Sequence, residues 1–182
     1  MEIRPAKHDE WESAMALAWR TFLHFEASDY TPQGVDSFLD FISDTTLNRM
    51  FIMGNYQLFV AVENEPKKYV GRYGGKDFLK DAQNGGTQME VEEKIVGLIS
   101  LREVNHISLL FVDEKYHKQG IGRALMNYVA DYLYEEKGKI FCTVNAAPYA
   151  VEFYKKVGFH AVKQEESKDG IRYTPMVWYF KQ

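Results

Sequence analysis

The segment from residue 112 to residue 126, VDEKYHKQGIGRALM, constrains the fold of this chain more than any other. An apolar, β-prone run precedes it and a helical pattern starts at its glycines, which predicts a strand, a tight turn and a helix in direct succession. Such a turn exposes backbone N–H groups at the positive end of a helix dipole, where phosphate binds. We therefore expect a phosphate-binding turn. The alternative is that Gly120 and Gly122 only let the chain change direction.

Two common phosphate motifs do not fit this turn. A dinucleotide-binding loop has a third glycine three residues after Gly122, where this chain has Leu125. A P-loop continues with lysine and then serine or threonine, whereas Gly122 is followed by Arg123 and Ala124. The turn therefore indicates a phosphate ligand of another kind.

The composition is typical of a globular enzyme or binding domain, and we expect a single domain over residues 1–182. The net charge is -4 with no long basic block, so nucleic acid is not an expected partner. No apolar stretch approaches the ~20 residues of a membrane span, the first residues lack a signal-peptide core, and a lone Cys142 makes no intramolecular disulfide. We expect a cytoplasmic protein that does not contact a membrane.

Hydrophobic periodicity predicts alternating helices and strands along the chain. Helices are expected near residues 9–26, 31–44, 120–137 and 148–157. Strands are expected near residues 1–4, 57–63, 95–101, 106–112, 139–144, 160–165 and 171–180, with hairpin turns at 103–105 and 168–170. Residues 64–94 hold five glycines among many charges and predict an insertion, either with short structure of its own or as a mobile flap.

Two segments together resemble the GCN5-related N-acetyltransferase (GNAT) family. Its pyrophosphate loop has the pattern Gln/Arg-x-x-Gly-x-Gly/Ala, which here is HKQGIG at residues 117–122, followed by RALM. A second family segment, FYKKVGF at residues 153–159, follows at the expected distance. His117 departs from the pattern at its first position. The resemblance implies an α+β fold with three layers, in which helices cover both faces of a mixed, mostly antiparallel sheet of about seven strands.

The resemblance also implies acetyl-CoA as co-substrate and no metal. Backbone N–H groups of the loop would hold the pyrophosphate, and the strand before it would splay from its neighbour and pair with the pantetheine amides. Asn145 is a weaker candidate, because Ala147 occupies the position where the family often has asparagine. The implied cofactor-binding residues are Leu110, Phe111, Val112, His117, Lys118, Gln119, Gly120, Ile121, Gly122, Arg123, Ala124, Asn145 and Tyr154.

Acetyl transfer to an amine poses two proton problems. A lysine-like amine has a pKa of ~10.4, so its protonation at pH 7 costs roughly 4.6 kcal/mol of reactivity unless a base removes the proton. By resemblance, His106 stands where related enzymes place a glutamate base, and a near-neutral pKa would suit it; Glu103 is a weaker alternative. By the same resemblance, Tyr154, four residues before Gly158, stands where the family commonly has a tyrosine near the coenzyme sulfur, and it is expected to protonate the leaving thiolate. The alternatives are a locally bonded histidine and a core tyrosine.

The resemblance also implies that the acceptor binds between the first two predicted helices and the later hairpins. The candidates are Phe22, Glu26, Asp29 and Tyr30, of which the two acids could receive a cationic amine. The alternative is that the aromatic residues belong to the core and the acids to the solvated surface. The predicted function is transfer of an acetyl group to a primary amine of a small molecule or protein. The alternative is a non-catalytic module that binds the coenzyme. Residues 176–180 could pair in a homodimer.

Overall fold

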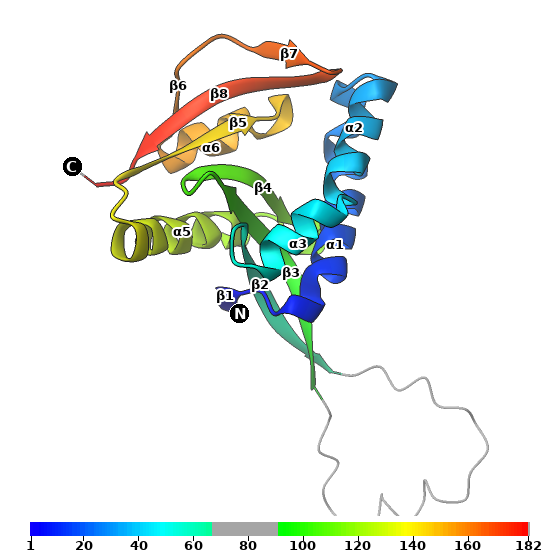
Figure 1. Ribbon diagram of the computed structural model, residues 1–182, viewed down its shortest axis with the longest axis vertical. Helices are drawn as coiled ribbons and strands as arrows, with labels where there is room; N and C mark the ends of the chain where they lie inside the picture. Colours follow the sequence, from blue (N-terminus) through cyan, green and yellow to red (C-terminus); the bar gives the residue numbers. More distant parts are fainter. Residues whose placement is uncertain (67–90, 182) are drawn as a thin grey trace, which may run out of the picture.

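An eight-stranded sheet forms the centre of the computed structural model, which describes residues 1–66 and 91–181 (Figure 1). The strand order is β1-β2-β3-β4-β5-β8-β6, with β7 paired to β8, and only the β4–β5 pairing is parallel. The predicted mixed, mostly antiparallel sheet is confirmed. The strands are β1 (Glu2–Pro5), β2 (Gln57–Pro66), β3 (Val91–Arg102), β4 (His106–Val112), β5 (Phe141–Ala146), β6 (His160–Ala161), β7 (Glu166–Lys168) and β8 (Ile171–Tyr179).

Helices cover both faces of this sheet. Figure 1 shows α1 (Trp11–Phe25), α2 (Pro32–Ile42) and α3 (Thr45–Ile52) on one side and α5 (Ile121–Lys137) on the other, with α6 (Val151–Val157) beside β5. Alternate residues of β4 face opposite sides of the sheet. Leu109 and Phe111 pack in the core under α1, and Leu110 packs against the core under α5. This alternation places both faces of β4, and therefore its end, within reach of helices from both layers.

Several predicted boundaries were wrong. Residues 64–66 and 91–94, assigned to the insertion, continue β2 and β3 as a paired ladder. One ion pair bridges these strand ends, since Lys94 Nζ lies 2.9 Å from Glu65 Oε1. The short helix α3 was not predicted, although Asp44 caps it by accepting from the N–H of Thr46 at 2.7 Å. The rest of the predicted insertion, and with it the flap, falls on residues 67–90, outside the described residues.

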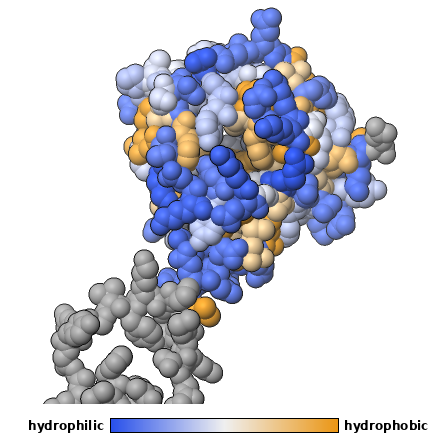
Figure 2. Space-filling view, turned by 180° about the vertical axis from the view of Figure 1, so that it is seen from behind, coloured by the Kyte–Doolittle hydropathy of each residue, from blue (hydrophilic) through white to orange (hydrophobic). Residues whose placement is uncertain are grey.

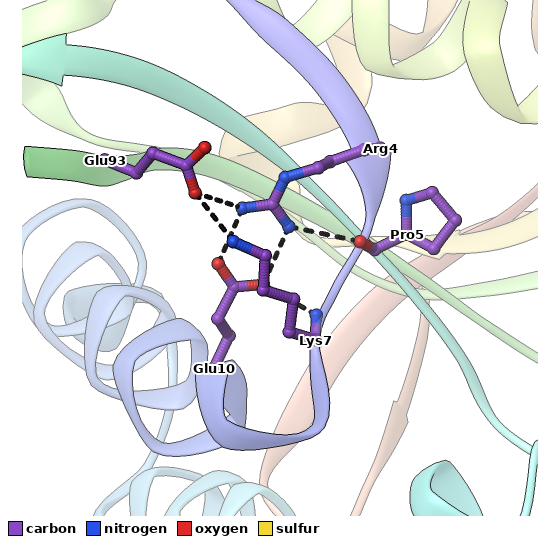
Figure 3. A network of polar contacts seen from close by, with 5 residues as sticks. All are labelled: Arg4, Pro5, Lys7, Glu10 and Glu93. Carbon is purple, nitrogen blue, oxygen red and sulfur yellow. Dashed lines mark hydrogen bonds and ion pairs between the residues drawn. The ribbon is translucent and has the colours of Figure 1, made fainter.

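A polar network fixes the start of α1 against the sheet (Figure 3). The Arg4 guanidinium donates to both carboxylate oxygens of Glu10, each at 2.8 Å, and Glu93 accepts from Arg4 and Lys7 at 2.9 Å. The hydrogen bond from Arg4 lowers the pKa of Glu10 below its usual value. These contacts join β1, β3 and the chain entering α1, so the direction of α1 across the sheet is set from this end.

The other half of α1 is held at the end of β4. Arg20 Nη2 lies 2.9 Å from Asp113 Oδ2, and His24 Nε2 lies 3.5 Å from Glu114 Oε1. Asp113 also accepts from the N–H of Lys115 at 3.1 Å, which orders the chain leaving the strand. Two separate anchors therefore place the end of α1 above the turn that leads into α5.

The face turned away from the view of Figure 1 is mainly hydrophilic, with separate apolar patches (Figure 2). Among the described residues, no helix combines the length and the apolar character needed to span a bilayer.

Candidate functional site

The sheet opens between β4 and β5. These strands pair only at His106–Thr143 and Ile107–Val144, after which they diverge (Figure 1). On its other side β4 continues to pair with β3, and the N–H of Asp113 donates to the carbonyl of Val96 at 2.8 Å. Because ladder hydrogen bonds alternate along an antiparallel pair, this bond turns the amide groups of Phe111 toward β3 and those of Leu110 into the opening. The expected splay is therefore present, and among the described residues it leaves the amide groups of Leu110 and the N–H of Val112 unpaired.

Two cavities lie at this opening. The large cavity, of about 520 Å³, runs between the end of β4, the turn before α5, α6 and the end of α1. The small cavity, of about 200 Å³, lies between β4, the end of β5 and the helices α1 and α2. Both are lined by Glu26, Leu110, Phe111, Ala150 and Tyr154.

The turn into α5 forms an anion-binding concavity at one end of the large cavity. No backbone carbonyl of the described residues accepts from the N–H groups of residues 118–123. Lys118 (φ 61°) and Gly120 (φ 83°) adopt the left-handed conformation, which turns successive N–H groups toward the same side. Lys118, Arg123 and Lys156 add positive charge to the lining. Unpaired donors, a helix N-terminus and cations together fit a pyrophosphate group.

Five of the predicted cofactor residues do not contribute as expected, and one of them is Phe111, whose amide groups face β3. The N–H of His117 donates to the carbonyl of Glu114 at 3.1 Å and its Nε2 donates to the carbonyl of Val112 at 2.7 Å, so its donors are occupied. The N–H of Ala124 donates to the carbonyl of Gly120 at 2.9 Å, as the first helical bond. Gln119 is not in the lining of the large cavity, and Asn145 lines the small one instead.

His117 has a different task. Its ring stacks on Phe25, with the ring centroids 4.7 Å apart, while its Nε2–H holds the carbonyl of Val112. The side chain therefore joins α1 to the end of β4, next to the turn. Its bond to Val112 occupies a carbonyl at the end of the strand that was expected to face the cofactor.

Tyr154 lies where the two cavities meet. Its side chain is 4% exposed and lines both of them. Burial raises the pKa of its phenol, and the nearby Glu26 and Cys142 add to this effect. The hydroxyl, which has no hydrogen-bond partner among the described residues, is therefore a protonated donor available to a ligand.

His106 lines the small cavity but does not have the expected near-neutral pKa. Its Nδ1 lies 2.8 Å from Thr143 Oγ1, and its Nε2 lies 3.3 Å from Arg102 Nη2. A guanidinium only donates, so Nε2 accepts and Nδ1 donates. Burial, with the charge of Arg102, lowers the pKa of His106 to about 4. The ring is therefore neutral at pH 7, with its lone pair already engaged.

Three of the four predicted acceptor residues line the small cavity. Phe22 and Tyr30 form part of its aromatic wall, with their rings stacked 5.5 Å apart, and Glu26 lies at its border with the large cavity. Burial, followed by the charge of Asp29, raises the pKa of Glu26 to about 7. Asp29 lies outside both linings. It acts on the site through its charge alone.

The aromatic wall includes residues that the sequence did not single out. Phe38 stacks on Phe22, with the centroids 4.0 Å apart, and Phe41 lies one helical turn further along α2. Their spacing is that of an apolar helix face, which predicts burial but not which cavity is lined. Phe153 packs over the turn, since a Cβ on Gly122 would lie 3.1 Å from its Cζ. That contact explains why the second glycine is needed.

Comparison with known proteins identifies the family that the sequence resembles, the GNAT acetyltransferases. Residues 75–180 match the family model described as "Acetyltransferase (GNAT) domain". The chain is 32% identical over 85 residues to the peptidyl-lysine N-acetyltransferase YiaC of Escherichia coli (strain K12), covering 47% of this chain and 55% of that protein. It is 31% identical over 106 residues to the uncharacterized N-acetyltransferase MJ1207 of Methanocaldococcus jannaschii, covering 51% and 46%. The chain thus spans about half the length of these curated relatives.

Solved structures share the fold over almost the whole chain. A GCN5-related N-acetyltransferase from Rhodopseudomonas palustris superposes with a TM-score of 0.67 at 20% identity, covering 98% of this chain and 94% of that one. PaiA N-acetyltransferase from Thermoplasma acidophilum, solved in complex with coenzyme A, gives 0.65 at 17% identity, covering 98% of both chains. With the family model matching more than half of its residues, the chain belongs to the GNAT acetyltransferase family.

Proposed function

We propose that this protein transfers the acetyl group of acetyl-CoA to a primary amine of a small molecule or a protein. One observation carries the proposal: a cavity that ends at a turn with unpaired N–H groups meets a second, largely apolar cavity at a protonated phenol, that of Tyr154. An acyl donor and an acceptor entering from the two cavities would meet at that point.

The large cavity suits the donor. The N–H groups of residues 118–123, together with Lys118, Arg123 and Lys156, would hold the pyrophosphate. The unpaired amide groups of Leu110 would bind the pantetheine arm as an added strand binds a sheet edge. This placement leads from the turn toward Tyr154.

The chemistry needs few groups from the protein. The coenzyme supplies an activated acetyl group, and Tyr154 would donate a proton to the departing thiolate. A backbone N–H facing the opening would stabilise negative charge on the carbonyl oxygen. The buried aromatic wall of the small cavity keeps bulk water from competing with the amine.

The relatives support an amine acceptor. One curated relative is named a peptidyl-lysine N-acetyltransferase, and solved neighbours include a spermidine N-acetyltransferase from Vibrio cholerae. Both names describe acceptors that carry a primary amine on an apolar stem. We extend this common chemistry to the present chain, without choosing between a peptide and a free amine.

The test is calorimetric titration with coenzyme A and release of its thiol from acetyl-CoA in the presence of a panel of amines. A Gly120→Val variant would strain the turn, because φ is 83° and the position is otherwise open. Gly54→Val is a matched control, since Gly54 has φ 78°, equally open surroundings and no part in either lining.

We expect wild type and Gly54→Val to bind coenzyme A and release thiol, and Gly120→Val to bind at least tenfold more weakly. Coenzyme binding without thiol release for any amine would identify a binding module. Equal affinity in all three proteins would remove the turn from the site.

A further inference from the structure

We propose that Glu26 is the catalytic residue that accepts the proton of the acceptor amine. The inference rests on the proposed function and adds the base that it lacks. Among the described residues, Glu26 is the only acid in the lining of either cavity, and it lines both. A group at that border would contact an amine approaching the acyl donor.

The position of Glu26 is fixed by the backbone. It caps the C-terminus of α1, and its N–H donates to the carbonyl of Phe22 at 2.9 Å. Phe22 in turn packs on Phe38 and Tyr30, so the cap is held by the aromatic wall. The carboxylate itself has no hydrogen bond or ion pair to the described residues. It is therefore free to receive an ammonium group.

The surroundings of Glu26 give its carboxylate a pKa suited to a base that acts near neutral pH. Asp29 follows it in the chain, and Tyr154 faces it from α6. Across the small cavity lie Arg102 and His106, which are bonded to each other. Tyr30 lines the small cavity beside Glu26, and the charges of Glu165 and Arg172 act on Tyr30. The other titratable groups line the large cavity: Tyr116, His117, Lys118, Arg123, Tyr149 and Lys156. Burial and Asp29 raise the pKa of Glu26 to about 7.

Acetyl transfer with Glu26 as the base conserves protons and bonds. The acceptor ammonium gives one proton to the Glu26 carboxylate and becomes a neutral amine. Its nitrogen attacks the thioester carbonyl, a C–N bond forms, and the C–S bond breaks. The second nitrogen proton replaces the one that Tyr154 gives to the thiolate. The products are an N-acetyl amine and the free thiol, and Glu26 returns its proton to solvent.

His106 is less suited to this step. Its Nε2 already accepts from Arg102, and its pKa of about 4 makes it a weak base. It also lines only the small cavity, whereas the proton must leave the amine where the two cavities join.

The experiment compares wild type with Glu26→Gln, Glu26→Asp and Asp29→Asn. For each protein, kcat/KM of thiol release from acetyl-CoA is measured from pH 5 to 9 with two probes, phenethylamine and Nα-acetyllysine methylamide. Affinity for coenzyme A and thermal unfolding verify that each variant is folded with an intact donor site.

We expect Glu26→Gln to lose about 100-fold or more in kcat/KM and to lose the limb near pH 7, with coenzyme affinity unchanged. Glu26→Asp should recover part of the rate and keep a limb. Asp29→Asn should move the limb to lower pH, since it removes a charge that raises the pKa of Glu26.

A Glu26→Gln variant within threefold of wild type, with the same limb, would overturn the inference while leaving the proposed function in place. A wild type that releases no thiol with any amine would overturn the proposed function, and this inference with it.

Discussion

Replacing Glu26 with glutamine should stabilise the fold above neutral pH, although the same change removes the proposed base. Burial and Asp29 raise the pKa of this carboxyl from 4.5 to about 7. The native state therefore holds the proton more tightly than the unfolded chain. The associated stability is fully present below about pH 4.5 and is lost as pH rises through about 7.

The size of the effect on the free energy of unfolding follows from the shift in the pKa of Glu26. At about 1.36 kcal/mol for each pKa unit, the full shift corresponds to an upper limit of about 3 kcal/mol. The Glu26 side chain is partly exposed to solvent, which screens part of this cost, so we expect about 1–2 kcal/mol at pH 8. Glutamine keeps the shape of the side chain without the charge. It should recover that amount.

Urea unfolding at pH 5 and pH 8 measures the effect. The control is Glu135→Gln, an exposed position of α5 away from both cavities. The stability gain of Glu26→Gln over wild type should be small at pH 5 and reach its full value at pH 8, whereas the control should show no such growth. A gain that does not change with pH, or a variant less stable than wild type at pH 8, would show that the fold does not raise the pKa of Glu26.

Three further changes test other parts of the site. Tyr154→Phe should lower kcat by about 100-fold or more. Coenzyme affinity and the unfolding temperature should stay close to wild type, because the hydroxyl has no partner among the described residues. An unchanged kcat would exclude Tyr154 as the proton donor. His106→Ala should lower turnover but keep the limb near pH 7, since burial lowers the pKa of His106 to about 4; disappearance of that limb in a pH–rate profile would restore histidine as the base. Gly34→Ala should raise the KM for amine more than the KM for acetyl-CoA. The added Cβ would clash with the carbonyl oxygen of Gly170 and push α2 away from the turn beside the small cavity. Equal changes in both KM values would contradict this prediction. Monoamines should be better acceptors than spermidine, because Glu26 is the only acid in the described lining and Arg102 repels a second cation; a clear preference for spermidine in steady-state assays would contradict the assignment.

Local signals predicted most of the fold. Thr31 and the proline after it mark the start of α2, and the Thr31 hydroxyl accepts from the N–H of Gly34 at 3.2 Å. Asp169 (φ 52°) and Gly170 (φ 80°) make the turn between β7 and β8. The turn into α5 was predicted from Gly120, whose left-handed conformation the structure confirms. In each case neighbouring residues are enough to set the backbone.

Interactions between distant residues account for what the sequence could not show. The ends of β2 and β3 were assigned to a loop because they are charged, yet Lys94 and Glu65 neutralise each other across the ladder. The pKa of His106 depends on its burial and on the charge of Arg102. The sequence does not show how deeply the folded chain buries this side chain. Glu26 was predicted as an acceptor residue, but its place at the border of two cavities follows only from the packing of α1 against β4.

We expect the turn into α5 to hold the pyrophosphate of the coenzyme beside the opening between β4 and β5. Titration of the ¹⁵N-labelled protein with coenzyme A, followed by two-dimensional NMR, tests it at individual N–H groups. The largest shifts should fall on residues 118–123 and on Leu110, whose amide groups the structure leaves unpaired, with little change at the bonded N–H of Ala124. Shifts that avoid this turn and cluster elsewhere, or no shifts at saturating coenzyme A, would contradict the account.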